Sequence, residues 1–199
     1  MSKLYYTYGS MSSAKTTILL TKAHAFSERN IPFLCLKSTI DDRDGHDVIK
    51  SRAGLERPCI SIEPYDNIKT IIEEYIANAQ MLSLDIPKWI FIDECQFLTQ
   101  EQVDQLADIV DLMDINVMCY GLRTDFQTHF FEGARRLMEI ADTIEEVKTS
   151  CACGRKAIVN ARFNDKGEVI IEGEQVLVGG DDVYVPLCRK CFREKVLNK

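Results

Sequence analysis

Short apolar runs alternate with amphipathic stretches over the first 150 residues of the chain. Each run is short enough for one buried strand, and the runs cover residues 4–8, 33–36, 58–62, 89–92 and 116–120. The clearest amphipathic stretch spans residues 67–80, where apolar side chains recur every three or four positions on one helical face. Such alternation predicts an α/β fold, in which a parallel sheet is covered by helices on both faces.

Two local signals refine this prediction. Thr99 and Gln102 form a capping-box pattern, which predicts a helix that continues to Leu112. The pattern changes near Lys148, after which residues 156–163 and 168–172 look like two strands joined by a turn. We therefore predict an α/β domain over residues 1–148 and a small β-rich subdomain over residues 149–199.

The segment after the first predicted strand has the pattern of a phosphate-binding loop. It reads Gly9-Ser10-Met11-Ser12-Ser13-Ala14-Lys15-Thr16, and its last two residues open the next helical pattern. Backbone N–H groups at a helix start attract phosphate, a lysine adds positive charge, and a threonine hydroxyl can hold Mg²⁺. The usual pattern has glycine where this chain has Ala14. The backbone there either keeps a negative φ or bears mild strain.

An acidic pair, Asp93-Glu94, directly follows the apolar run at residues 89–92. A carboxylate at the end of a buried strand lies at the carboxyl edge of a parallel sheet, where ligands bind. Asp93 could hold Mg²⁺ there, directly or through water, and Glu94 could act as a base. The alternative is that the two acids only end the strand and cap the segment after it. The Lys15-Thr16 pair upstream disfavours that alternative.

Four of the eight cysteines form two close pairs near the end of the chain. They are spaced as Cys151-x-Cys153 and Cys188-x-x-Cys191, which is typical of a zinc site, although the first pair is one residue tighter than usual. Four thiolates leave no open position on the metal, so this zinc would be structural and would supply much of the local folding free energy. The alternative is a chance set of free thiols.

Charge and hydropathy exclude several classes of protein. The net charge of −7 argues against a protein whose main role is to coat nucleic acid. No apolar stretch is long enough to cross a bilayer, and the first residues lack the pattern of a signal peptide. We therefore expect a cytoplasmic protein with neither a nucleic-acid nor a membrane partner.

Together these motifs resemble the zinc-containing cytosolic thymidine kinases, the type II group. The matching segments occur in the family's order and are residues 9–16, 91–97 and 121–126, Gly179-Gly180 with Tyr184, and residues 188–191. The resemblance implies a P-loop (RecA-like) parallel sheet covered by helices. It also implies a small C-terminal zinc-binding β subdomain that carries a loop covering the substrate.

The resemblance also assigns roles to residues. Residues 9–16 together with Asp93, Glu94, Cys95 and Gln96 would bind ATP and its Mg²⁺. Glu94 would take the proton from the 5′-hydroxyl of thymidine, and Arg43 would lie near the transferred phosphoryl group. The residues expected around the thymine are Met11, Phe97, Leu122, Phe126, Phe131, Tyr184 and the loop Gln175, Val176, Leu177, Val178 and Gly179. By pattern alone, core packing is the favoured role for each of the phenylalanines.

The resemblance further implies a homotetramer that its end product dTTP inhibits. Other readings of the motifs remain open. A helicase or translocase also carries Asp-Glu-x-Gln after a strand, but such motors normally need two ATPase modules or ring neighbours. A nucleic-acid-binding zinc protein would leave Asp93-Glu94 unexplained. Another deoxynucleoside kinase is the remaining alternative.

Overall fold

Six parallel strands form the main sheet of the protein. The computed structural model describes residues 1–41, 45–176 and 183–197. The strands lie in the order β5-β2-β6-β7-β1-β8, and every neighbouring pair runs parallel. Their bounds are β1 (Leu4–Gly9), β2 (Phe33–Ser38), β5 (Ile60–Ile62), β6 (Trp89–Asp93), β7 (Asn116–Gly121) and β8 (Thr143–Val147). Because the strands are parallel, all their carboxyl ends meet at one edge of the sheet.

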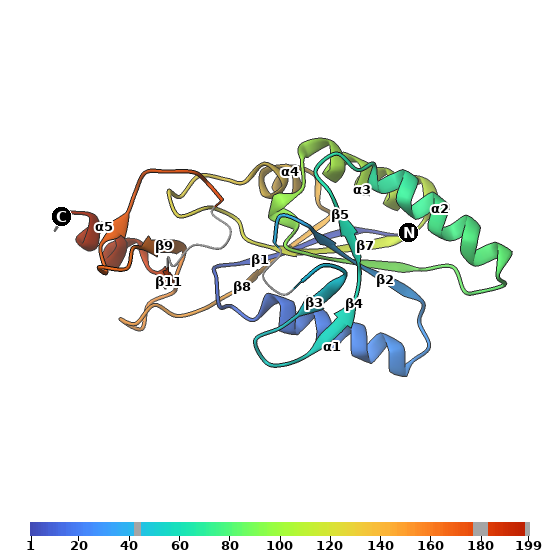
Figure 1. The fold of residues 1–199 in the computed structure, drawn as a ribbon, viewed down its shortest axis with the longest axis horizontal. Coiled ribbons are helices and arrows are strands. Elements are labelled where there is room, and N and C mark those ends of the chain that lie inside the picture. Colours follow the sequence, from blue (N-terminus) through green and yellow to red (C-terminus); the bar gives the residue numbers. More distant parts are fainter. Residues whose placement is uncertain (42–44, 177–182, 198–199) are drawn as a thin grey trace.

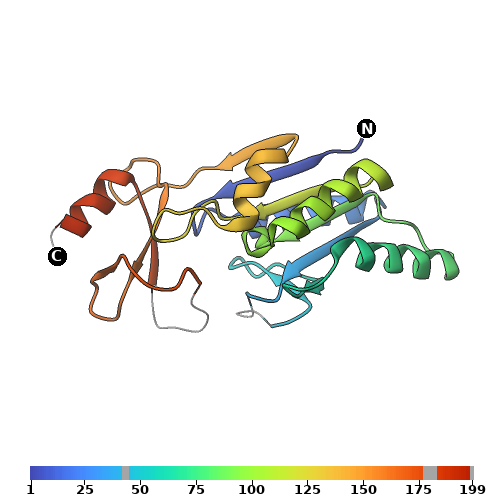
Figure 2. The same ribbon diagram turned by 90° about the horizontal axis from the view of Figure 1, so that it is seen from above.

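Helices cover both faces of this sheet (Figures 1 and 2). On one face, α1 (Lys15–Glu28) packs Leu19, Leu20 and Ala23 against β2, β6 and β7. The helices on the other face are α2 (Ile68–Met81), α3 (Gln100–Met113) and α4 (Glu132–Ile140). The α/β architecture predicted from the alternating pattern is therefore confirmed.

Two predicted helix starts are confirmed by their caps. The Asn67 side chain accepts a hydrogen bond from the Thr70 backbone N–H at 2.9 Å, so α2 begins where its apolar face begins. Thr99 and Gln102 form the complete capping box, because each side chain accepts from the other residue's backbone N–H at 3.1 Å. Both boundaries are therefore visible in the local sequence.

Two parts of the sheet differ from the predicted pattern. The run at residues 58–62 is divided: β4 (Glu56–Pro58) pairs with β3 (Val48–Lys50) in a separate antiparallel ribbon, and only β5 joins the main sheet. The division falls at Cys59, whose backbone N–H donates to Asp47. The pattern also contains no sign of β8, because Ile144 and Glu145 of this edge strand are both exposed.

The C-terminal segment forms a smaller antiparallel sheet at one end of the molecule (Figure 1). It contains β9 (Val159–Phe163), β10 (Val169–Ile170) and β11 (Val183–Leu187), followed by α5 (Arg189–Leu197). The predicted turn at residues 164–167 joins β9 to β10, and the Asn164 side chain accepts from the Lys166 and Glu168 N–H groups. The predicted domain boundary after residue 148 stays a prediction. Within the described ranges, no helix is both long enough and apolar enough to cross a membrane.

Candidate active site

The phosphate-binding loop joins the end of β1 to the start of α1. A Cβ atom at Gly9 would collide with the Ser13 hydroxyl and would lie 2.6 Å from the Val147 carbonyl oxygen, so glycine is needed there for space. Ser12 and Ala14 have φ values of 59° and 64°, in the left-handed region. Of the two possibilities for Ala14, the structure therefore shows the strained one.

The loop carries groups suited to an anion. The Lys15 ammonium donates to the Ser10 carbonyl oxygen at 3.0 Å and lies 3.4 Å from the Ser13 hydroxyl. Burial lowers the pKa of Lys15, while the nearby Glu94 and Asp93 act to raise it. Among the described residues, the buried Ser10 hydroxyl has no hydrogen-bond partner. A buried cation beside an unpaired hydroxyl would gain from a bound phosphate.

Asp93 ends β6 and faces the start of α1. The Thr16 hydroxyl donates to the Asp93 carboxylate at 3.3 Å, which joins the phosphate loop to the acidic pair. Burial, reinforced by the neighbouring charge of Glu94, raises the pKa of Asp93 to about 7. A buried carboxylate beside a hydroxyl gives the oxygen ligands that Mg²⁺ prefers. These two residues therefore fit a magnesium ion.

Glu94 follows the last residue of β6, and its carboxylate is held by the side chain of Gln96. Its φ of 52° is left-handed, and the short helix η1 (Cys95–Phe97) follows it. The Gln96 side-chain amide donates to the Glu94 carboxylate at 2.6 Å and accepts from the Leu122 backbone N–H at 2.9 Å. The Cys95 thiol is fully buried in the hydrophobic core. The Cys95 side chain is thus enclosed in the core, and the Gln96 side chain is engaged by Glu94 and Leu122.

Aromatic side chains gather beside the acidic pair. The rings of Phe97 and Phe131 meet edge to face with centroids 5.7 Å apart. Phe126 is only 1% exposed and lies under the Arg162 guanidinium, 5.1 Å from ring centroid to Cζ. Phe97 is half-buried, so it is more accessible to a ligand than Phe126.

Side chains from the C-terminal segment reach this region. Asn160 of β9 accepts from the Met11 N–H of the phosphate loop at 2.7 Å and donates to the Thr124 carbonyl oxygen at 3.0 Å. Gln175 donates to the buried Asp125 carboxylate at 2.8 Å. Tyr184 lies half-buried on β11, opposite Arg162 of β9. The C-terminal segment thus lies against the phosphate loop and against the loop that follows β7.

Asn160 and Asp125 are not among the predicted site residues. Asp125 carries a local signal, because its carboxylate accepts from the N–H groups of Gln127 and His129 in a tight turn. Asn160 carries none, since its partners are 149 and 36 residues away. Four predicted site residues, Arg43, Leu177, Val178 and Gly179, lie outside the described residues.

The four late cysteines come together as their spacing predicts. The sulfur atoms of Cys151, Cys153, Cys188 and Cys191 all lie within 4.8 Å of one another, and those of Cys153 and Cys188 are 3.6 Å apart. Tetrahedral zinc with bonds of about 2.3 Å would place its sulfur ligands about 3.8 Å apart. Backbone N–H donors at Cys153 and Cys188 lower the pKa of the Cys151 thiol to about 6, which favours the thiolate. The cluster could hold one zinc ion.

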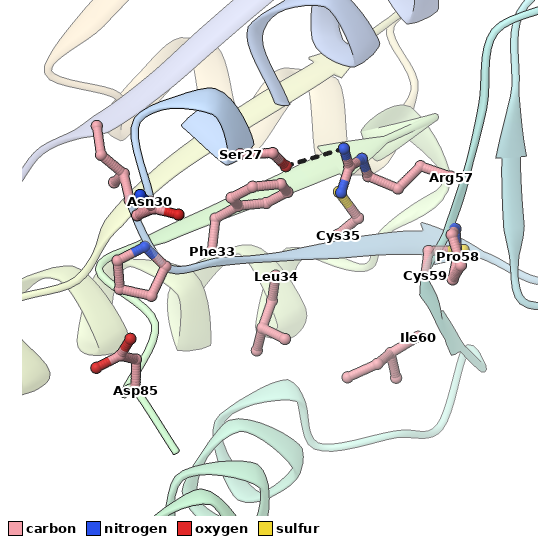
Figure 3. A pocket seen from close by; sticks show the side chains of 12 residues that line it. Ser27, Asn30, Phe33, Leu34, Cys35, Arg57, Pro58, Cys59, Ile60 and Asp85 are labelled. Carbon is pink, nitrogen blue, oxygen red and sulfur yellow. Dashed lines mark hydrogen bonds between the residues drawn. The ribbon is translucent and has the colours of Figure 1, made fainter. Parts of the chain in front are cut away.

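A cavity of about 630 Å³ lies elsewhere on the molecule (Figure 3). It is lined by the end of α1, the start of β2 and the segment around Arg57, whose guanidinium donates to the Ser27 hydroxyl at 3.0 Å. The phosphate loop is instead at the carboxyl edge of the sheet. This cavity is therefore separate from the candidate site.

A parallel sheet with a phosphate loop after β1 and an acidic pair after β6 defines a P-loop nucleotide-binding protein. A family model described as "Thymidine kinase" matches residues 2–192. The chain belongs to the thymidine kinase family, which confirms the resemblance seen in the sequence.

Individual relatives agree with the family model. A thymidine kinase of Mannheimia succiniciproducens is 43% identical over 195 residues, which cover 98% of this chain and 97% of the relative. One of Shewanella oneidensis is 44% identical over 194 residues, covering 98% of each chain. One of Rhodopirellula baltica is 40% identical over 199 residues, covering 100% of this chain and 92% of the relative. These relatives support a thymidine kinase and give no better support to the alternative of a nucleic-acid motor.

Proposed function

We propose that this protein transfers the γ-phosphoryl group of ATP to the 5′-hydroxyl of thymidine, giving dTMP. The observation that carries the proposal is the contact of Thr16 with Asp93, which joins the phosphate loop to the acidic pair at 3.3 Å in a chain of the thymidine kinase family. Residues 1–148 would form the ATP-binding domain. Residues 149–199 would form the zinc subdomain with its substrate-covering loop.

Residues 9–16 would bind the ATP phosphates. The transition state of phosphoryl transfer is loose, so positioning and neutralisation of charge supply most of the acceleration. Lys15 would neutralise charge on the phosphates from the loop, and Arg43 would do so near the transferred group. Thr16 and Asp93 would hold Mg²⁺, Asp93 through water, and the bound ion would neutralise further phosphate charge. Cys95 and Gln96 would contribute to the ATP site through their backbone groups.

Glu94 would act as the general base. It lies next to Asp93 at the carboxyl edge of the sheet, where the hydroxyl of a bound nucleoside could approach the phosphates. Its carboxylate would take the proton of the 5′-hydroxyl as the oxygen attacks phosphorus. General-base assistance of this kind contributes about 10²–10⁴-fold.

The thymine would lie between the phosphate loop and the C-terminal segment. Met11, Phe97, Leu122, Phe126, Phe131 and Tyr184 would surround it, and residues 175–179 would close over it. The half-buried Phe97 supports a stacking role, and the bond from Gln175 to Asp125 supports the position of the closing loop. Main-chain groups that read the base edge would reject a mismatched base, because their buried polar atoms would lose partners.

The remaining features follow the family resemblance. Cys151, Cys153, Cys188 and Cys191 would hold one structural zinc. We expect a cytoplasmic homotetramer that dTTP inhibits by occupying the site.

The proposal is tested by the variant Glu94→Gln. It should retain binding of Mg²⁺·ATP but lose about 10²–10⁴-fold in kcat for dTMP formation, because the amide cannot accept the proton. Initial rates with labelled thymidine measure kcat, and calorimetry measures ATP affinity. Glu74→Gln on the exposed face of α2 is the matched control and should behave as wild type. Unchanged turnover in Glu94→Gln would remove Glu94 from the base role.

A further inference from the structure

We propose that Gln96 is a positioning residue for Glu94, and that it sets the direction of the base from the end of β7. Its side-chain amide bridges the Glu94 carboxylate and the Leu122 backbone N–H, at 2.6 Å and 2.9 Å. This inference rests on the proposed role of Glu94 as general base. It differs from a role for Gln96 in holding ATP, because the side chain acts on the base and not on the nucleotide.

The orientation of the Gln96 amide is unambiguous. A backbone N–H can only donate, so the atom facing Leu122 must be the amide oxygen. The amide nitrogen is then the atom that faces the Glu94 carboxylate. A flipped amide would oppose donor to donor at one end and acceptor to acceptor at the other. Since Gln96 is only 1% exposed, water would not repair that mismatch.

Gly121 independently indicates that this space is reserved for the amide. A Cβ atom at Gly121 would lie 2.5 Å from the Gln96 amide oxygen and 2.7 Å from the Cys95 sulfur. The φ of Gly121 is not in the left-handed region, so the backbone conformation does not require glycine. The glycine instead allows Gln96 to approach the end of β7.

The far end of the bridge is itself fixed. The Leu122 carbonyl oxygen accepts from the buried Tyr6 hydroxyl at 2.7 Å, while its N–H donates to Gln96. A chain of hydrogen bonds through Gln96 and Leu122 therefore connects the Glu94 carboxylate to Tyr6 in the core of the sheet. Leu122 is also expected beside the thymine, so the bridge would align the base with the bound nucleoside. A displacement of about 1 Å in such a group can cost about 10²-fold in rate.

The main test is Gln96→Met, which keeps the length of the side chain and removes both hydrogen bonds. We expect kcat for thymidine phosphorylation to fall about 10–100-fold, while KM for ATP and its binding affinity change less than about 3-fold. A role in ATP binding predicts the opposite division, with KM for ATP raised and kcat retained. That result, or an unchanged kcat, would overturn the inference.

A matched control separates positioning from a general loss of stability. Gln102 is another buried glutamine, 2% exposed, whose amide donates to the Glu63 and Asp66 carbonyl oxygens away from the site. Gln102→Met should lower the melting temperature and leave kcat of the folded enzyme unchanged. If Gln96→Met does not fold, Gln96→Glu keeps the shape and the acceptor for Leu122 but sets a carboxylate against Glu94. Its kcat should also fall, and an unchanged kcat would contradict the bridge.

A double-mutant cycle distinguishes this inference from the proposed function. If Gln96 acts through Glu94, then adding Gln96→Met to Glu94→Gln should cost less than about 2-fold in kcat. Equal losses in both backgrounds would show that Gln96 acts independently of Glu94 and would overturn the inference alone. A Glu94→Gln variant with full activity would instead refute the base role in the proposed function.

Discussion

The phosphate-loop region and the C-terminal segment contribute to the same site in different ways. The phosphate loop is one continuous stretch between β1 and α1, and the side chains of Lys15 and Thr16 at its end contact Ser10 and Asp93. In its described residues, the C-terminal segment has a small buried cluster, which includes Cys151 and Cys188. It reaches the site through individual side chains, notably Asn160 and Gln175. The phosphate loop thus lies on the large sheet, whereas the proposed thymidine-covering loop belongs to a segment whose cysteine cluster could hold a metal.

The largest effect is expected when the cysteine cluster loses one of its four ligands. Cys188→Ser should abolish zinc binding and unfold the C-terminal segment, because apparent zinc affinities of about 10–16 kcal/mol supply folding free energy in such small units. Thymidine binding should then be lost, while Mg²⁺·ATP still binds. Elemental analysis measures zinc, hydrogen exchange measures order, and calorimetry measures both ligands.

The control for this variant is Cys59→Ser, since Cys59 is a half-exposed cysteine outside the cluster. It should keep about one zinc per chain and full activity. If Cys188→Ser loses zinc and still binds thymidine normally, the two regions do not differ as described.

The second effect concerns the acid in the phosphate-loop region. The folded-state pKa of Asp93, about 7, is above the ordinary value of 3.8. The native state therefore holds this proton more tightly than the unfolded state, and stability falls as the pH rises from about 4 to about 7. Without Mg²⁺, Asp93→Asn should raise the free energy of unfolding by about 1–4 kcal/mol at pH 8 and by little at pH 4. Its kinase activity should be lost.

Denaturant titrations at the two pH values measure this difference. Asp111→Asn, on the exposed side of α3, is the control and should show no such dependence on pH. If Asp93→Asn raised the free energy of unfolding equally at pH 4 and pH 8, burial of the Asp93 charge would not explain the gain in stability.

The smallest effect is expected at Ala14, whose φ of 64° is unfavourable for alanine. Ala14→Gly should raise the free energy of unfolding by at most about 1 kcal/mol, since relief of strain is partly offset by the flexibility of glycine in the unfolded chain. Ala23→Gly, in the middle of α1, should instead lower it by about 1 kcal/mol or more. Thermal unfolding of the two variants compares them, and two losses of equal size would refute strain at Ala14.

The same contrast explains what the sequence could predict. The phosphate loop, the acidic pair, the capping box of α3 and the cysteine pairs are recognisable because each depends on residues close together in the chain. The meeting of the two cysteine pairs was predictable as well, because the two spacings together are typical of one zinc site.

Features that depend on long-range contacts were not predictable. β8 is an edge strand with exposed Ile144 and Glu145, so it lacks a buried apolar pattern. The bonds from Asn160 to Met11 and Thr124, and from Gln96 to Leu122, join residues on separate elements. Nothing in the residue types marks them as partners. The neighbouring strands β6 and β7 bring Gln96 to Leu122, and the position of β9 beside the phosphate loop brings Asn160 to Met11.

The most direct test of the account is the product formed from thymidine. The purified protein is incubated with Mg²⁺·ATP and, in parallel, with labelled thymidine, labelled deoxycytidine or single-stranded DNA. The account predicts that thymidine is converted to dTMP with one ATP consumed per product, and that DNA does not stimulate ATP turnover. Unphosphorylated thymidine, together with ATP turnover stimulated by deoxycytidine or DNA, would contradict it.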